Sequence, residues 1–186
     1  MASRDGLSEH LELAARMVPL LEPADRVARG LVAAFERGGR VYTFGNGGSS
    51  ADAAHFAEEL LGRFKRERRP LPAQSLSIDA SALTCIANDY SYDEVFERQV
   101  RGFVRGGDVV IGFSTSGRSP NVVRGLAAAH ELGAFTVLFG GGAPGADHAD
   151  VALTIPSEST ARIQEMHVLL LHLILEQVDE WAASQP

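Results

Sequence analysis

Three short runs of apolar, β-prone residues are each followed at once by glycine or hydroxyl residues, and this alternation constrains the fold most strongly. The runs cover residues 41–44, 109–113 and 135–139, and the segments after them are GNGGSS (45–50), STSGRS (114–119) and GGG (140–142). Segments with the 3.6-residue spacing of amphipathic helices lie between these units. Short apolar strands that alternate with helices are typical of a parallel sheet, whose strands are buried on both faces.

The remaining pattern predicts one α/β domain. We expect further strands at residues 73–78 and 151–155, and helices at residues 7–18, 24–37, 50–61, 92–104, 121–132 and 161–181. Residues 1–38 would form an N-terminal helical hairpin, and residues 40–182 a doubly wound, five-stranded parallel sheet flanked by helices, within a single domain of residues 1–186. Ligands of such sheets bind beyond the carboxyl ends of the strands, where the glycine and hydroxyl segments fall.

Composition excludes several functional classes. A chain of 186 residues, 45% of them hydrophobic, fits one globular domain and is too apolar to be disordered. The net charge of -7, with Lys65 as the only lysine, argues against nucleic-acid binding, and the basic run RFKRERR (63–69) is the one local exception. The N-terminus lacks the apolar core of a secretory signal, and no apolar stretch approaches the roughly 20 residues of a membrane span. We therefore expect neither a nucleic acid nor a membrane as a partner.

The chain contains one cysteine, Cys85. A single thiol cannot form an intramolecular disulfide or a cysteine-based zinc site, which favours a reducing compartment and hence a cytoplasmic location. Cys85 has no cysteine or histidine at metal-binding spacing, and we interpret it as a small core residue.

The STSGRS segment ends one strand and opens a helix. Its hydroxyls, together with the free N–H groups and positive dipole of a helix start, suit a phosphate monoester. Serine and threonine are also ordinary helix caps, but capping needs one hydroxyl and this segment supplies four. They belong to Ser114, Thr115, Ser116 and Ser119. We therefore expect a phosphate site at this segment.

The GNGGSS segment invites comparison with a dinucleotide-binding loop. Its spacing is G-x-G-G rather than G-x-G-x-x-G, and the second expected strand ends about 30 residues later rather than about 20. A small sugar phosphate lying against these backbone amides fits the pattern better than a nucleotide does.

Histidines and a carboxylate on two expected helices form the second candidate group. His55 and Glu59 are four residues apart on one helix face, so they could share a metal or a proton. Gln164 and His172 are eight residues apart, about 12 Å along a helix, and one ion could join them only with both side chains extended. His172 lies in the apolar run LLLHLI, where a lone histidine is more often structural. Arg63 follows Glu59 by one turn, as in an ion pair, although its guanidinium could equally bind a phosphate or a substrate hydroxyl.

Four segments, in this order and separation, resemble those of sugar isomerase (SIS) domain proteins, and more narrowly those of the phosphoheptose isomerases. They are FGNGGSSADAAHFAEEL, ANDYSYDEVF, FSTSGRSPNVV and TARIQEMHVLLLH, and the resemblance runs over nearly the whole chain. It implies an aldose–ketose isomerase that converts sedoheptulose 7-phosphate to D-glycero-D-manno-heptose 7-phosphate. It also implies a five-stranded parallel sheet and a homotetramer with active sites between subunits.

The resemblance assigns roles to individual residues. Glu59 and His172 match the catalytic pair of the family. The ligands of one zinc ion per subunit, as described for members that bind zinc, are matched by His55, Glu59, Gln164 and His172. Arg63 is expected to bind the phosphorylated sugar because of its position one turn after Glu59. The resemblance implies that the other sugar-binding residues are Asn46, Gly47, Gly48, Ser49, Glu59, Asn88, Asp89, Ser114, Thr115, Ser116, Ser119 and Gln164.

One alternative belongs to a different functional class. Some relatives of these isomerases are tetrameric, non-catalytic interaction proteins that bind the replication initiator. They share the SIS loops and the RIQEMH segment but lack the equivalents of Glu59 and His172, which this chain retains, so we favour the isomerase. Some isomerases carry an aspartate where this chain has Ala161, and any role of that carboxylate is absent here or filled by another group.

Overall fold

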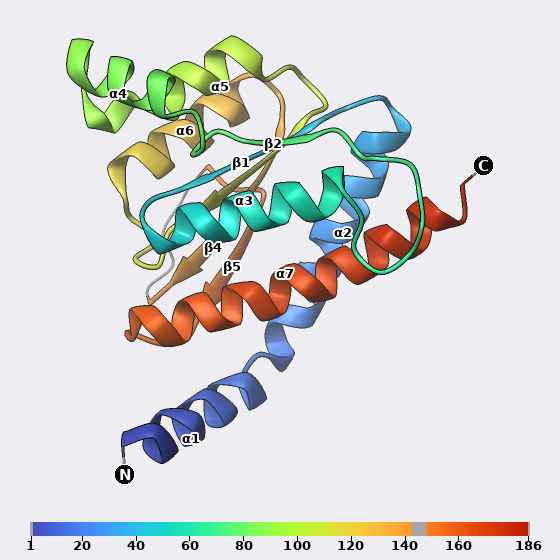
Figure 1. The fold of residues 1–186 in the computed structure, drawn as a ribbon, viewed down its shortest axis with the longest axis vertical. Coiled ribbons are helices and arrows are strands. Elements are labelled where there is room, and N and C mark those ends of the chain that lie inside the picture. Colours follow the sequence, from blue (N-terminus) through green and yellow to red (C-terminus); the bar gives the residue numbers. More distant parts are fainter. Residues whose placement is uncertain (1, 143–147, 186) are drawn as a thin grey trace.

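Five parallel strands form one sheet, as the sequence predicts. The computed structural model describes residues 2–142 and 148–185. The strands are β1 (Val41–Gly45), β2 (Ala73–Ser75), β3 (Val109–Phe113), β4 (Phe135–Gly141) and β5 (Val151–Ile155). Their order across the sheet is β2-β1-β3-β4-β5, and every neighbouring pair is parallel (Figure 1). The topology is therefore the doubly wound one.

The central strands are apolar throughout because both of their faces are covered. Every residue of β1 and β3 is buried. Along β3, Val109, Ile111 and Phe113 contribute to one cluster of buried apolar side chains, whereas Val110 contributes to another. A strand buried on both sides shows no alternation of apolar and polar residues, which explains the continuous apolar runs in the sequence.

Helices form a layer on each face of the sheet (Figure 1). One layer consists of α2 (Leu21–Glu36), α3 (Gly48–Leu61) and α7 (Thr160–Ala183), and the other contains α5 (Glu97–Phe103) and α6 (Pro120–Glu131). The bounds of α2, α3, α6 and α7 agree with the expected helices to within a few residues. None of the helices in residues 2–142 and 148–185 is both long and apolar enough to cross a membrane.

Several segments differ from the expected elements. β2 covers Ala73–Ser75 and not the whole of residues 73–78, and the first helix covers Ala2–Ala15 rather than residues 7–18. Residues 92–104 form a 3-10 turn, η2 (Tyr92–Glu94), followed by α5, and not one continuous helix. A further helix, α4 (Ala80–Asp89), escapes the sequence pattern because none of its residues is buried; it is capped by Asp79, which accepts from the N–H of Ala82. Cys85 lies on α4 and is exposed, so its interpretation as a core residue is wrong.

The two N-terminal helices are present, but they do not fold back on each other as a hairpin. α1 (Ala2–Ala15) continues through a 3-10 turn, η1 (Val18–Leu20), into α2 and projects from the body of the molecule (Figure 1). Leu13 is buried against that body, and the His10 Nδ1 atom lies 2.7 Å from Glu165 Oε2 of α7. One face of α1 is therefore attached to α7.

The strand register brings the candidate loops to one edge of the sheet. Gly45 at the end of β1 lies beside Phe113 at the end of β3, and Phe113 lies beside Phe139 of β4. Because parallel strands end at the same edge, the glycine segment, the hydroxyl segment and the glycines that end β4 are neighbours.

Candidate active site

The glycine segment after β1 makes a tight turn into α3. Gly47 has a positive φ of 54°, which glycine adopts without a steric penalty, and α3 begins at the next residue. The side-chain amides of Asn46 and Asn121 exchange two hydrogen bonds of 2.8 and 2.9 Å. The Tyr92 hydroxyl donates to Asn46 Oδ1 at 2.9 Å. These bonds connect the turn to the start of α6 and hence to the hydroxyl segment.

Gln164 of α7 lies over the same turn. A methyl group at Gly48 would overlap the Gln164 side-chain amide, so the absence of a side chain at Gly48 permits this close approach. Ser49 is buried and its backbone N–H donates to the Asn46 carbonyl at 3.0 Å. The structure thus brings together Asn46, Gly48, Ser49 and Gln164, which the resemblance assigns to sugar binding.

The hydroxyls of the STSGRS segment converge. Ser114 Oγ lies 2.9 Å from Ser119 Oγ and 3.3 Å from Ser116 Oγ. The N-cap of α6 is Ser119, and its side chain makes no capping hydrogen bond to the helix. Helix capping therefore does not explain this cluster, whereas three hydroxyls facing one another beside a helix N-terminus suit a phosphate.

A cavity of about 390 Å³ adjoins the hydroxyl segment. Thr115, Ser116 and Arg118 line it from that segment. Ser157 and Glu158 line it from the connection between β5 and α7, and Thr160 from the first residue of α7. Sequence analysis did not assign roles to Arg118, Ser157 or Thr160. The available signal was the position of SEST (157–160) directly after the last strand, because the end of that strand meets the same edge of the sheet.

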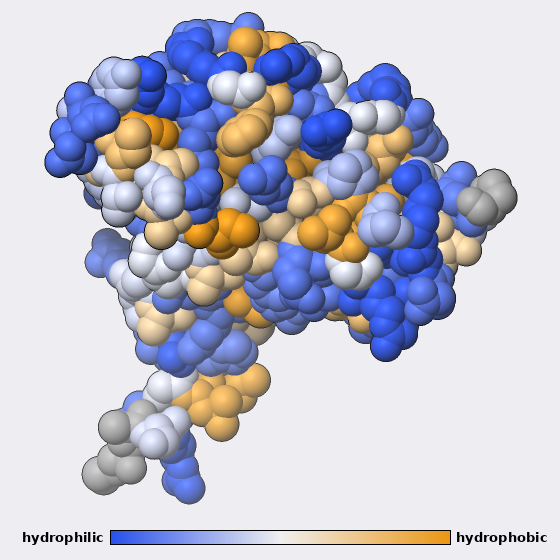
Figure 2. All heavy atoms as spheres, turned by 45° about the horizontal axis from the view of Figure 1, so that its top comes forward, coloured by the Kyte–Doolittle hydropathy of each residue, from blue (hydrophilic) through white to orange (hydrophobic). Residues whose placement is uncertain are grey.

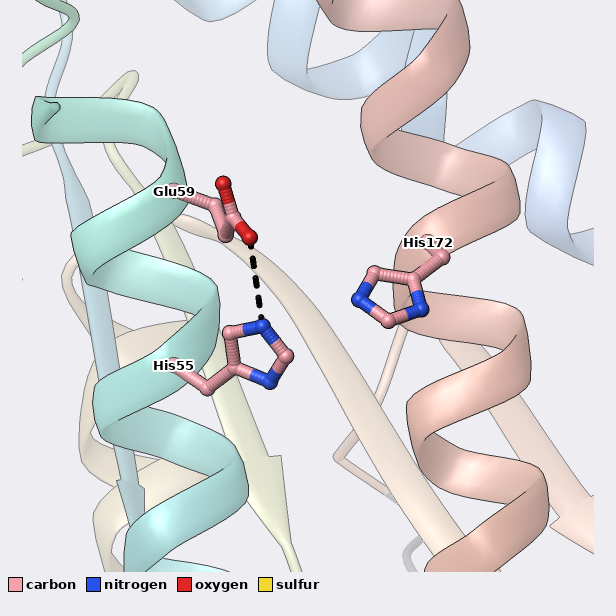
Figure 3. A group of neighbouring side chains, drawn as sticks. All are labelled: His55, Glu59 and His172. Atoms are coloured by element: carbon pink, nitrogen blue, oxygen red, sulfur yellow. Dashed lines mark hydrogen bonds and ion pairs between the residues drawn. The ribbon is translucent and has the colours of Figure 1, made fainter. Parts of the chain in front are cut away.

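Three potential ligand groups face one another between α3 and α7, as Figure 3 shows. His55 and Glu59 lie on α3, with His55 Nε2 3.3 Å from Glu59 Oε1, and His172 projects from α7 toward them. The rings of His55 and His172 are 5.1 Å apart and nearly perpendicular. The His55 side chain is 33% exposed and that of Glu59 is 17% exposed, so a small molecule can reach a partly dry site.

Electrostatics distinguish the titratable groups of this site. Partial burial lowers the pKa of His172, and the nearby charges of His55 and Lys65 add to the lowering, while Glu59 and Glu176 oppose it. Asp52, one turn before His55 on α3, is buried, and burial raises the pKa of its carboxyl to about 6 although His55 opposes the shift. Sequence analysis did not identify Asp52 as a candidate titratable residue of this site. Its spacing of three residues from His55, about one helical turn, could have indicated it.

The donor set fits a divalent metal ion. One ligand atom from each of His55, Glu59 and His172 can be chosen so that all three lie within 4.8 Å of one another. Two imidazoles and a carboxylate with room for further ligands are typical of catalytic zinc sites. Gln164 precedes His172 by two turns of α7 and lies against Gly48, and its role as a fourth ligand remains a prediction.

The structure places three other expected residues away from this cluster. α3 ends at Leu61, so Arg63 lies beyond the helix and is exposed, and within the described residues it forms no ion pair with Glu59. The expected ion pair between Arg63 and Glu59 is therefore wrong. Asn88 and Asp89 end α4, where the Asn88 amide donates to Asp89 Oδ1 at 2.8 Å and both side chains are exposed.

Comparison with known proteins agrees with this geometry. A family model described as SIS domain matches residues 11–141. A phosphoheptose isomerase from Aquifex aeolicus is 51% identical over 161 residues, which cover 86% of this chain and 84% of that protein. The structure of a phosphoheptose isomerase from Neisseria gonorrhoeae superposes with a TM-score of 0.88 at 38% identity, covering 96% of this chain and 97% of that one. A second such structure, from Francisella tularensis, gives a TM-score of 0.86 at 30% identity and covers 97% and 100% of the two chains.

Proposed function

This chain belongs to the phosphoheptose isomerase family of SIS-domain proteins, and we propose that it converts sedoheptulose 7-phosphate to D-glycero-D-manno-heptose 7-phosphate. The observation that carries this proposal is the placement of Glu59 and His172, which face each other from α3 and α7 (Figure 3). A carboxylate and an imidazole at that separation can act on adjacent atoms of one small substrate.

Aldose–ketose isomerisation requires two kinds of proton transfer. A base moves a proton between C1 and C2 by way of an enediol, and a second group moves a proton between the two oxygens. We assign the first role to the Glu59 carboxylate, which is largely sheltered from solvent. Such a residue contributes about 10² to 10⁴ in rate.

We assign the oxygen-bound protons to His172. Its lowered pKa favours the neutral imidazole at physiological pH. One nitrogen of a neutral imidazole can accept a proton from one substrate oxygen and, once protonated, return it to the other oxygen.

The remaining expected residues would bind the substrate. The hydroxyls of Ser114, Thr115, Ser116 and Ser119 would hold the phosphate, and the turn at residues 46–49 with Gln164 would hold the sugar. Arg63, Asn88 and Asp89 are exposed, and we propose that they complete the site of a neighbouring subunit in a homotetramer. Exposed apolar residues on α1 support such an assembly.

We further propose that one zinc ion binds His55, Glu59 and His172, with Gln164 as the fourth ligand. Such an ion, when bound, supplies a Lewis acid that polarises the substrate carbonyl. A reducing cytoplasm remains the expected location, because the one cysteine is an exposed free thiol.

The direct test is an isomerisation assay. Purified protein is incubated with sedoheptulose 7-phosphate, once with added zinc and once with a chelator, and the aldose product is followed by chromatography. We expect conversion in the metal-supplied sample. A lack of conversion there would overturn the proposed reaction and favour a non-catalytic role for the same fold.

A further inference from the structure

The basic segment between α3 and β2 contacts α7. Figure 1 shows the chain leaving α3, curving along α7 and returning to β2. Phe64 stacks on His172, with ring centroids 5.6 Å apart and planes inclined by 25°, and Arg68 forms an ion pair with Asp179. We call residues 64–68 the clasp segment. Lys65, Arg66 and Arg68 each pair with an acidic residue of α7, so this basic run does not require an external anionic partner.

The Arg68–Asp179 ion pair is the buried part of the clasp segment. Each side chain is 1% exposed, and Arg68 Nε donates to Asp179 Oδ1 at 3.2 Å. Asp179 Oδ2 also accepts from the backbone N–H of Arg66 at 3.0 Å. Removing two charges from water is costly unless their other donors and acceptors also form hydrogen bonds. The stability of this ion pair therefore depends on the partners of the remaining Arg68 donors.

Those remaining donors contact the end of α3. Arg68 Nη2 donates to the carbonyl of Glu59 at 2.6 Å, and Nη1 donates to the carbonyl of Leu60 at 2.9 Å. Carbonyls in the last turn of a helix lack partners within the helix. A planar guanidinium can donate to these carbonyls and to Asp179 at once, and a lysine ammonium could not reproduce that geometry.

One side chain therefore joins the backbone of Glu59 to α7. Asp179 follows His172 by seven residues, which places it on nearly the same face of α7 and about 10 Å along the axis. We propose that Arg68 and Asp179 are positioning residues that set the separation of α3 and α7 at which the Glu59 carboxylate faces the His172 imidazole. Phe64 supplies a second contact to His172. This inference rests on the isomerase function proposed above.

A positioning role differs measurably from a purely structural one. A structural ion pair would change only the free energy of unfolding. A pair that positions Glu59 should change turnover, because a misplacement of about 1 Å can reduce a rate about 10²-fold. The Michaelis constant should change little, because the hydroxyl segment lies between β3 and α6 and, among the described residues, forms no hydrogen bond with the clasp segment.

The test uses two conservative variants and a matched control. Asp179→Asn keeps the shape and removes the charge, and Arg68→Lys keeps the charge and removes the planar donor set. We expect kcat to fall about 10- to 100-fold in each folded variant while KM stays within about threefold of the wild type. Affinity for Co²⁺, measured by chelator competition, should fall by about 10-fold or more. The control is Arg124→Lys, which alters an exposed pair with Glu97 and should change none of these quantities.

Several outcomes would overturn the positioning role. Folded variants whose kcat and Co²⁺ affinity stay within about twofold of the wild type would do so. If neither variant folds, the same two quantities, kcat and Co²⁺ affinity, are measured for Phe64→Leu, which removes the stacking on His172 and keeps an apolar side chain. Values within about twofold of the wild type would again overturn the positioning role.

Crystal structures of the wild type and of a folded variant give a readout that does not depend on turnover. An unchanged separation of α3 and α7 at Glu59 would overturn the positioning role even in an active enzyme. A wild type that fails to isomerise the sugar phosphate, with a wider separation in the variant, would instead overturn the proposed function and leave the positioning role intact.

Discussion

Glu59 and its neighbour Glu58 allow a sharp test of the catalytic assignment at the scale of single residues. Glu59 faces His55 and His172, whereas Glu58 is exposed and points about 100° around the helix from Glu59. We expect Glu59→Gln to lower kcat by about 10² to 10⁴, because an amide cannot take up the carbon-bound proton. Binding of the sugar phosphate, measured by calorimetry, should remain detectable. Glu58→Gln should retain wild-type turnover, and full activity of Glu59→Gln would contradict the assignment.

His167 connects one buried side chain to the pH dependence of stability. It is buried edge-on against Phe113 and Phe139, its Nε2 atom lies 3.0 Å from the Gly140 carbonyl, and burial lowers its pKa to about 4. Between pH 6.5 and pH 4 the unfolded chain binds a proton that the folded chain does not, so this histidine lowers the free energy of unfolding as pH falls. From pH 7.5 to pH 5 the loss is about 2 kcal/mol.

The free energy of unfolding of the wild type and of His167→Gln is measured by urea unfolding at pH 7.5 and at pH 5. Glutamine keeps a donor for the Gly140 carbonyl and does not titrate. The variant should lose about 2 kcal/mol less than the wild type over this range, whatever its stability at pH 7.5. Equal losses in the two proteins would show that His167 is not held neutral by burial.

At the scale of elements, the close packing of β4 against the hydroxyl segment predicts a sensitive position. A methyl group at Gly141 would lie 2.5 Å from the Thr115 carbonyl oxygen and 2.6 Å from Ile163 Cδ1. Gly141→Ala should therefore displace the segment, lower the free energy of unfolding by about 1–3 kcal/mol and raise KM for the sugar phosphate about 10-fold. Steady-state kinetics and urea unfolding measure both effects. Gly102→Ala on α5, where a methyl group meets no atom within 4 Å, is the control and should leave KM unchanged.

Elements with a buried stripe or a β-prone apolar run could be predicted from the sequence, whereas α4 could not. β3 agrees with its expected bounds because burial on both faces leaves an unbroken apolar run. α4 has no buried residue and so no pattern. Arg63 was expected one turn after Glu59, but the helix ends at Leu61, and it is Arg68 that contacts this helix end. Arg68 meets Asp179 across 111 residues, and local spacing carries no information about such a pair.

In the candidate site, too, some features could be predicted from the sequence and others could not. Clustering of the hydroxyls of Ser114, Ser116 and Ser119 follows from their order in one segment, so sequence could predict it. The meeting of His55 with His172 depends on the packing of α3 against α7, and spacing alone favoured a structural role for His172. Family resemblance supplied that pairing, and the facing side chains agree with it.

At the scale of the whole molecule, a net charge of -7 must be reconciled with an anionic substrate. The α3 and α6 helices begin at the edge of the sheet where β1 and β3 end, so both present N–H groups and positive dipole ends there. Arg118 adds a cation at the cavity beside the hydroxyl segment. These local donors thus offset the net negative charge where the phosphate is expected to bind, although Glu158 also lines the cavity.

The projecting N-terminal helix carries the prediction about assembly. Leu7 and Leu11 are 59% and 60% exposed and lie one turn apart on α1, and Figure 2 shows apolar surface on this projection. Leaving such side chains in water forfeits about 1.5–3 kcal/mol each relative to burial, so we expect them to lie in the interface of the proposed homotetramer.

Replacing both leucines by glutamate should place charges in that interface and shift the particle from a tetramer toward smaller species of the 19.9 kDa chain. Light scattering coupled to gel filtration measures the mass, with Glu12→Gln on the same helix as the control. If active sites lie between subunits, turnover should fall in parallel with the mass. A double variant that remains tetrameric at micromolar concentration would exclude this face of α1 from the interface, whereas a smaller particle with full turnover would place the active site within one subunit.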